Sequence, residues 1–292
     1  MRAVKASEMI NMSIKLLAIG LCINLIGACT TAPPVVAPTS PAEVGELRAG
    51  TGFLKGYLAP AEALDSLALL PPPPIEGSPA LSADTATFNT LTKFQGTPRG
   101  AMAISDANLN FPEAASVFSC ALGMQISEKG TPNLNMLLRR TLTDTALATY
   151  KAKNKYARVR PFIMLKAGSC TPKEEAFLAK DGSYPSGHSA IGWGWALLLT
   201  ELAPDRKDAL LQRGRAFAQG RAICGVHWQS DIDAGRLVGS AAVAQLHANA
   251  VFNAQMSAAR AEIARARVVG APPTAACLAE AATIAGSSLS AP

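Results

Sequence analysis

Helical spacing of apolar side chains is the feature of this sequence that most constrains its fold. Between residues 133 and 156, apolar residues recur every three or four positions, which predicts one amphipathic helix over 133–156. No segment keeps the two-residue alternation of apolar and polar side chains that marks a half-buried strand. The sequence therefore predicts an all-α fold, a single helical bundle. The residues that set the helical period are Leu134, Leu137, Leu138, Leu142, Ala146 and Tyr150.

Three further helical segments follow from apolar runs and the signals at their ends. The apolar stretch 188–203 predicts a helix that Pro204 terminates, because proline cannot continue a helix. A second helix is expected over about 206–219, with Asp205 as its N-terminal cap. Residues 228–267 are expected to form one long helix or two consecutive helices.

The first 28 residues have the pattern of an export signal. An apolar run over 16–28 is too short and too early in the chain for a membrane span. It ends at Cys29 in a sequence that resembles a lipoprotein signal-peptidase box, which predicts a signal peptide over 1–28 and lipidation of Cys29. An ordinary signal peptide cut slightly later is the alternative, and translation from Met12 would give a signal of similar form. Either way we expect a periplasmic protein, with an outer-membrane lipid anchor in the lipoprotein case.

The remaining chain divides into a linker, one domain and a tail. Residues 29–45 are rich in Pro, Thr, Ala and Val, which is typical of a linker. The helical domain is expected over 46–285, followed by a tail over 286–292. Within the domain, Pro71–Pro74 must be extended, because proline fixes φ and excludes helix.

The composition is that of a globular chain with a sizeable core. Of 292 residues, 49% are hydrophobic and 16% are charged, which argues against disorder. The net charge of +6 comes without a basic run interleaved with aromatic residues, so no nucleic-acid partner is indicated. A mildly basic body is compatible with anionic substrates.

Four cysteines follow Cys29, and an even number in an exported chain is compatible with two disulfides. Three pairings are open, and buried free thiols are the alternative. These cysteines are Cys120, Cys170, Cys224 and Cys277.

Three short segments carry the residue types that transfer of a phosphoryl group needs, namely cations and preorganised donors around the transferred oxygens. Lys153 precedes Arg160 by seven positions, and Arg221 supplies a third cation. The middle segment, Pro-Ser-Gly-His, precedes an expected helix whose first N–H groups are free to bind an anion. In it Ser186 adds a hydroxyl and Gly187 allows close approach of the backbone.

Two histidines and one carboxylate complete this set. His227 and Asp231 are four residues apart, so on a helix the carboxylate holds one ring nitrogen and leaves the other free to attack phosphorus. His188 is then the candidate acid for the leaving alkoxide and the base for water, with an ordinary pKa near 6.5. Arg158 is a rival of Arg160 for the phosphate, but the proline after Arg160 favours the latter.

The order and spacing of these segments resemble the signature of the bacterial class A non-specific acid phosphatases. These share a superfamily with type 2 phosphatidic-acid phosphatases and vanadium haloperoxidases. Longer stretches look similar as well, over 67–77, 152–162, 182–188 and 223–234. The resemblance implies a helical bundle and a periplasmic enzyme without cofactor or metal. It implies that the residues that bind phosphate are Lys153, Arg160, Ser186, Gly187 and Arg221, and that those that catalyse are His227, His188 and Asp231.

We therefore expect a broad phosphomonoesterase acting through a phosphohistidine, with small phosphomonoesters as substrates and phosphate or vanadate as inhibitors. Transfer to alcohols and homo-oligomerisation are compatible with this. The alternatives are a vanadium haloperoxidase, in which His227 ligates vanadate, a lipid phosphate phosphatase at a membrane surface, and a phosphate-binding protein without activity. One position departs from the family, because Gly220 stands where a serine is usual. The missing hydroxyl is expected to weaken phosphate binding by about 1.5–3 kcal/mol at most.

Overall fold

The computed structural model describes residues 35–268 and 274–286. The predicted signal peptide, Cys29, the first part of the linker and most of the tail lie outside the described residues. Helices make up most of the described chain, and its only β pairing is an isolated bridge between Glu46 and Leu54. The prediction of an all-α fold is confirmed.

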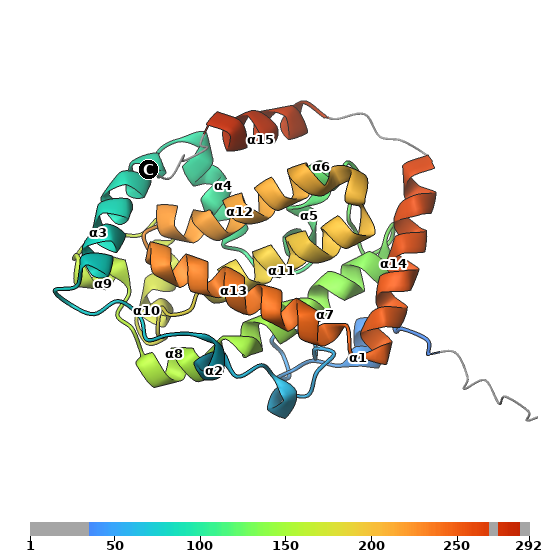
Figure 1. The fold of residues 1–292 in the computed structure, drawn as a ribbon. Helices are drawn as coiled ribbons and strands as arrows, with labels where there is room; N and C mark the ends of the chain where they lie inside the picture. The colour runs from blue at the N-terminus through green and yellow to red at the C-terminus, as the bar shows by residue number, and fades with distance from the viewer. Residues whose placement is uncertain (1–34, 269–273, 287–292) are drawn as a thin grey trace, which may run out of the picture. The chain divides into compact units, whose positions relative to one another are not determined.

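Four helices form the centre of the bundle. The apolar helix α11 (Gly187–Leu202) packs against α12 (Lys207–Ile223), α13 (Gln229–Leu246) and α7 (Pro132–Ala148) (Figure 1). Trp195 of α11 is fully buried among them, and its indole N–H donates to the Leu138 carbonyl at 3.0 Å. The apolar faces of these helices therefore meet in one core, as their spacing predicts.

The other helices cover the ends and sides of this centre. Helix α14 (Ala250–Val268) packs on α7, while α3 (Pro79–Leu91) and α4 (Pro98–Asp106) pack on α12 (Figure 1). The remaining described helices are α1 (Pro41–Val44), α2 (Ser66–Leu69), α5 (Glu113–Ser116), α6 (Ser119–Leu122), α8 (Tyr150–Tyr156), α9 (Pro161–Met164), α10 (Glu175–Leu178) and α15 (Ala275–Gly286).

The single helix predicted over 133–156 is wrong, because the chain breaks at Thr149 into α7 and α8. Ser66, distant in sequence, inserts here: its hydroxyl accepts the Ala152 N–H at 3.0 Å and lies 3.4 Å from the Thr149 carbonyl. A side chain that takes a helical N–H in this way interrupts the ladder. Tyr150, predicted to face the core, is 43% exposed beyond the break.

The other helix boundaries follow the sequence closely, with local differences. Residues 228–267 form two helices, α13 and α14, and the Asn249 side chain caps the second by accepting the Phe252 N–H. The helix expected over 206–219 continues to Ile223. The cap position belongs to Arg206 and not to Asp205, because a 3₁₀ turn over Pro204–Arg206 precedes the helix.

The predicted linker and the proline run also take definite positions in the described chain. Residues Pro41–Val44 of the linker form the short helix α1, because the Ser40 side chain caps it and the Glu43 carboxylate accepts the Ser40 N–H. Pro71–Pro74 lie outside any helix, as predicted. The Tyr184 hydroxyl donates to the Pro71 carbonyl at 2.9 Å, so the proline run lies against the segment before α11.

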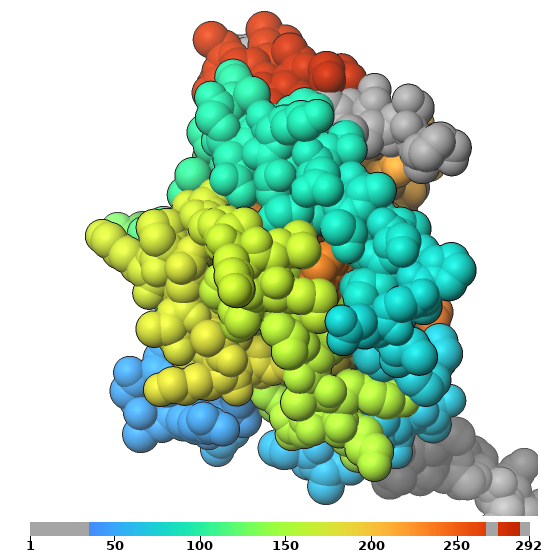
Figure 2. All heavy atoms as spheres, turned by 90° about the vertical axis from the view of Figure 1, so that its left-hand side faces the viewer, coloured from blue at the N-terminus to red at the C-terminus, as the bar shows by residue number. Residues whose placement is uncertain are grey.

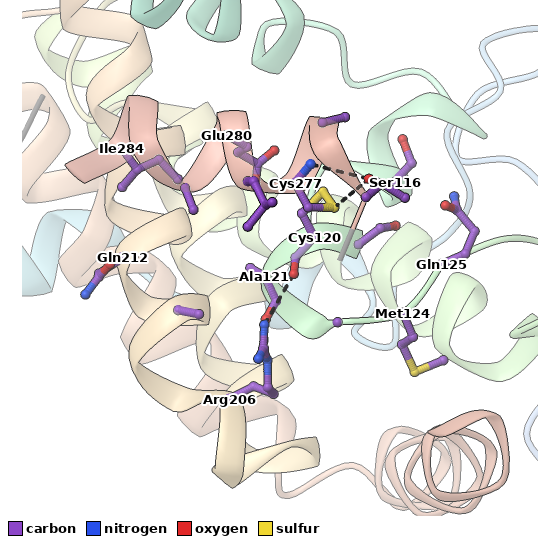
Figure 3. Close-up of a pocket in the computed structure, with 17 residues that line it drawn as sticks. Ser116, Cys120, Ala121, Met124, Gln125, Arg206, Gln212, Cys277, Glu280 and Ile284 are labelled. Atoms are coloured by element: carbon purple, nitrogen blue, oxygen red, sulfur yellow. Dashed lines mark hydrogen bonds between the residues drawn. A yellow bond between two sulfur atoms is a disulfide. The ribbon is translucent and has the colours of Figure 1, made fainter. Parts of the chain in front are cut away.

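Two disulfides join the four cysteines of the domain, which settles the open pairing. Cys170 pairs with Cys224 at the end of α12, and Cys120 in α6 pairs with Cys277 in α15. Beside the second disulfide, α6, the start of α12 and α15 enclose a cavity of about 700 Å³ (Figure 3). None of the predicted site residues lines this cavity.

In the described part of the chain, no helix combines the length and the apolar character needed to cross a bilayer. The same residues include no group of three or more His, Cys, Asp or Glu side chains arranged to hold a metal ion.

Candidate active site

The three sequence motifs meet at one end of the bundle, where α11 and α13 begin and α12 ends (Figure 1). Figure 2 shows this end from outside. The yellow-green chain of α8 to α10 and the teal chain of α3 and α4 cover it, and a small orange surface of α13 is visible between them. The site is therefore built from segments that lie up to about 80 residues apart, from residue 153 to residue 231.

Helices α11 and α13 approach closely because a glycine stands at their contact. A Cβ added at Gly235 of α13 would lie 2.4 Å from the Ser186 carbonyl oxygen, closer than side chains are found. At the same contact the Ser186 N–H donates to the Asp231 carbonyl at 3.0 Å. This contact joins the second motif to the third.

A tight turn at Gly225 connects α12 to the short segment before α13. Gly225 has φ +75°, a left-handed conformation that glycine adopts without strain. Its carbonyl accepts the Phe162 N–H at 3.2 Å, which fixes the first motif beside the turn. Arg221 before the turn and His227 after it therefore belong to one site.

The two ring nitrogens of His227 have different partners. Nε2 lies 3.0 Å from Nη1 of Arg160, which is always a donor, so Nε2 accepts and carries its lone pair. Nδ1 lies 3.4 Å from Oδ2 of Asp231, so Nδ1 carries the ring proton and donates it in a hydrogen bond to this oxygen. The same carboxylate oxygen accepts the Trp228 N–H at 2.8 Å. The site thus holds one tautomer of His227, with Nε2 as the nucleophilic nitrogen.

Lys153 and Arg160 are buried and held by carbonyl groups. Lys153 Nζ donates to the Gly182 carbonyl at 2.6 Å, and Arg160 Nε donates to the Leu178 carbonyl at 2.8 Å. Both cations also contact the Asp181 carboxylate, at 3.3 Å from Lys153 and 3.1 Å from Arg160. Lys153 is only 4% exposed, although Lys151 and Lys155 on the same short helix are exposed. Burial lowers the pKa of Lys153 to about 8.

Arg221 differs from the other two cations. Its side chain is fully buried, and none of its three guanidinium nitrogens has a hydrogen-bond partner among the described residues. Nη2 of Arg221 forms an ion pair with Oε2 of Glu174 at 3.5 Å. Burial lowers the pKa of Arg221 to about 10. Buried donors without partners are rare and lower the stability of the fold, so we infer that this guanidinium is preorganised to bind an anion.

His188 lies in the first turn of α11. Its Nε2 is 3.0 Å from the Ala107 carbonyl, an obligate acceptor, so Nε2 carries a proton and Nδ1 is the nitrogen left for chemistry. Burial is the main cause that lowers the pKa of His188 well below 6.5, followed by the charges of Arg221 and, more weakly, of His227 and Arg160. The charges of Arg221, Arg160 and His227 thus all act on the ring of His188.

The expectation of an ordinary histidine pKa in this site is wrong. The pKa of His227 also lies well below 6.5, because the ring is buried and Arg160, Lys153 and Arg221 repel a positive charge. Sequence shows which cations are present but not that they surround a buried ring. Both rings therefore take up a proton less readily than a free imidazole when no anion offsets the cations around them.

Ser186 and Gly187 begin α11 beside these groups. The Ser186 oxygen accepts the Ser189 N–H at 3.2 Å, which caps the helix. A Cβ at Gly187 would meet only the Thr149 hydroxyl, at 3.9 Å, so the backbone here is open to a close approach. The structure thus brings all eight predicted site residues of the domain to the same end of the bundle.

Arg158, the rival of Arg160 in the sequence, points away from the cations. Its guanidinium donates to Asp231 Oδ1 at 2.6 Å and to Asp84 Oδ2 of α3 at 2.8 Å. Sequence reasoning missed Asp84 altogether, because no spacing links it to the three motifs. It also missed Asp181 and Glu174, the carboxylates that contact the cations.

The expectation for Gly220 is not supported by its position in the fold. A Cβ added at Gly220 would lie 3.3 Å from Ala103 of α4, so a side chain there would point between α12 and α4. Nη1 of Arg99 lies 3.9 Å from the same Cβ, within reach of a serine hydroxyl. The glycine allows the two helices to pack closely.

Comparison with known proteins supports the same assignment. A family model described as the PAP2 superfamily matches residues 134–254. A non-specific acid phosphatase of Providencia stuartii is 46% identical over 210 residues, which are 72% of this chain and 85% of the relative. An acid phosphatase of Zymomonas mobilis subsp. mobilis is 41% identical, over 70% of this chain and 77% of the relative. A non-specific acid phosphatase of Salmonella typhimurium is 39% identical, over 71% of this chain and 83% of the relative. With identity this high along most of each relative, the chain belongs to the PAP2 superfamily and, within it, to the class A type of bacterial acid phosphatases.

Proposed function

We propose that the protein is an exported acid phosphatase that hydrolyses phosphate monoesters through a phosphohistidine on His227, without a metal ion. The observation that carries this proposal is the buried guanidinium of Arg221, whose three nitrogens lack hydrogen-bond partners in the described chain. It belongs to the same site as the nucleophilic Nε2 of His227. The relatives named above are acid phosphatases, which supports the same reaction.

In the first step, Nε2 of His227 attacks phosphorus, so that a P–N bond forms as the P–O bond to the leaving group breaks. Asp231 accepts a hydrogen bond from Nδ1–H, which stays on the ring, and stabilises the positive charge that the ring acquires. Lys153, Arg160 and Arg221 bind the three remaining oxygens, with the Ser186 hydroxyl and the Gly187 N–H at the start of α11. Arg160 turns from Nε2 to an oxygen of the phosphate.

His188 donates the proton that the leaving alkoxide needs. Its Nε2 proton is held by the Ala107 carbonyl, so the transferred proton comes from Nδ1 of the imidazolium. The free site lowers the pKa of His188, and the charge of a bound phosphate ester acts in the opposite direction and raises it. The acid is therefore present in the complex at low pH and is lost as the pH rises through this raised pKa.

In the second step, neutral His188 takes a proton from water, which attacks phosphorus and releases His227. The P–N bond breaks and inorganic phosphate leaves. An alcohol in place of water gives transfer of the phosphoryl group, since the intermediate does not distinguish the two acceptors chemically.

Hydrolysis by the purified protein should persist in a strong chelator, because the three cations and the helix start supply the charge that a metal provides elsewhere. The measurement is a panel of nucleotide, sugar and aryl phosphates, assayed with and without EDTA. Complete loss in EDTA that zinc or magnesium reverses would mean a metal-dependent reaction. A parallel assay of bromide oxidation with added vanadate should stay at background, and turnover there would favour the haloperoxidase instead.

Replacing His188 with alanine should spare the first step for esters with good leaving groups, which need no proton. With 4-nitrophenyl phosphate we expect a burst of one nitrophenol per site followed by slow turnover, because the water in the second step loses its base. Stopped-flow absorbance measures this. For an alkyl phosphate the same variant should show no burst, and equal rates for both esters would contradict the role of His188.

Export to the periplasm and lipidation of Cys29 remain part of this proposal. The two disulfides of the domain favour an oxidising compartment. Incorporation of labelled palmitate into the full-length protein, and its loss in Cys29→Ser, tests the anchor directly.

A further inference from the structure

A second charged group lies behind Asp231, on the side away from His227. Arg158 Nη1 donates to Asp231 Oδ1 at 2.6 Å, while Nη2 donates to Asp84 Oδ2 at 2.8 Å. Ser230 links the two charged side chains as well. Its N–H donates to Asp84 Oδ1 at 2.9 Å, and its hydroxyl donates to Asp84 Oδ2 and accepts from Arg158 Nη1. Four charged or polar side chains are therefore connected in series from α3 to the imidazole.

This series is shielded from water throughout. The side chains of Asp84, Arg158, Asp231 and His227 are each at most 6% exposed, and Arg158 lies over the Trp228 ring at 5.3 Å. Charges in such surroundings interact more strongly than at a surface. Each member therefore influences the proton affinity of the next.

We infer that Arg158 and Asp84 are positioning residues that set the charge on Asp231 and, through it, the nucleophilicity of His227. Arg158 stabilises the ionised form of the Asp231 carboxylate. Asp84 partly neutralises the positive charge of Arg158 and so weakens this stabilisation. The inference rests on the proposed function, because it concerns the nucleophile of that reaction. Neither residue touches the phosphate.

All charged groups that face Asp231 enter this argument. Arg158 contacts it directly, and the charges of Lys153 on α8 and Arg160 before α9 also act on it, as does the Tyr184 phenol. Burial raises the pKa of Asp231, and Arg158 is the first of the groups that oppose this rise. Arg158 therefore has more effect on Asp231 than any of the other cations.

The test is the acidic limb of the pH profile of kcat/KM, which reports the protonation of the free enzyme. Arg158→Gln removes the cation, so Asp231 and His227 hold protons more tightly and the limb should move up by about one pH unit. Asp84→Asn leaves Arg158 with a fuller positive charge, so the limb should move down by a smaller amount. Arg158→Lys keeps the charge and should return the limb close to that of wild type.

Opposite shifts separate this role from a purely structural one, since loss of packing alone gives no reason for the two variants to diverge. Asp144→Asn is the matched control, because Asp144 is an equally buried carboxylate that binds the backbone at Tyr57 and Leu58 instead. Its limb should coincide with that of wild type. If Arg158→Gln does not fold, the other two variants still test the inference. The acidic limb of Asp84→Asn should move down, while that of Arg158→Lys should stay close to wild type.

Limbs that move in the same direction in Arg158→Gln and Asp84→Asn, or that stay in place, would overturn the inference. Its failure is distinct from failure of the proposed function. If His227→Ala is inactive while both profiles match wild type, only the positioning role is wrong. If His227→Ala retains turnover, the nucleophile itself is misassigned.

Discussion

Replacing His227 with alanine should reduce kcat by a factor on the order of 10⁴ or more, to the background of the assay. Alanine offers no nitrogen to attack phosphorus, so the phosphohistidine cannot form. The cations around the site remain and still bind the substrate, so KM should change little compared with kcat. Steady-state kinetics with 4-nitrophenyl phosphate measures both.

The matched control for this variant is His247→Ala. His247 is exposed, contacts Glu201 at 3.3 Å and lies at the end of α13 remote from Asp231. That variant should keep the activity of wild type. Far-ultraviolet circular dichroism and thermal unfolding show whether each variant is folded. Hydrolysis by a folded His227→Ala at a rate near wild type would refute the covalent mechanism.

Replacing Arg221 with methionine should raise the stability of the protein while lowering kcat/KM by about 10²–10³-fold. The buried guanidinium has no hydrogen-bond partner in the described chain, so its desolvation is offset by the ion pair with Glu174 and by a weaker attraction to Asp106. Methionine fills a similar volume without a charge. Glu174, whose side chain is 39% exposed, keeps access to water after this change, so the loss of its partner costs little.

The comparison that isolates this effect is Arg213→Met on the same helix. Arg213 is equally buried, but Nη1 and Nη2 both donate to the Asp106 carboxylate and Nε donates to the Val117 carbonyl. Loss of Arg213 leaves Asp106 buried without its cation and should lower the free energy of unfolding of the protein by about 3–5 kcal/mol. Calorimetry in phosphate-free buffer should show a higher Tm for Arg221→Met and a lower one for Arg213→Met.

Added phosphate distinguishes the site further. It should raise the Tm of wild type, because a ligand that binds the native state stabilises it, and should do so much less in Arg221→Met. A lower Tm for Arg221→Met in phosphate-free buffer would show that this guanidinium stabilises the fold and is not held in readiness for an anion.

The sequence predicts the bundle and the site because both depend on local patterns. The apolar period predicts α7, and the apolar run before Pro204 predicts α11. His227 and Asp231 meet, but not on one helical face as predicted, because α13 begins at Gln229 and His227 precedes its cap residue. What the sequence misses comes from contacts between distant segments. Ser66 interrupts the helix at Thr149, and no local signal near Thr149 predicts that break.

The same reason accounts for the errors within the site. Asp84 meets Arg158 only after α3 folds over α13, so spacing along the chain cannot reveal the pair. The orientation of Gly220 toward α4 depends on how two helices pack. The lowered pKa of both histidines depends on burial beside Arg160 and Arg221, which composition does not show.

The most direct measurement of the central claim is to trap the phosphoenzyme. His188→Ala is mixed rapidly with 4-nitrophenyl phosphate and quenched, and peptides are mapped by mass spectrometry under alkaline conditions that preserve phosphohistidine. The account predicts one phosphoryl group per molecule on the peptide that contains His227. A phosphoryl group on Ser186 or on another residue, or no labelled peptide during the nitrophenol burst, would contradict it.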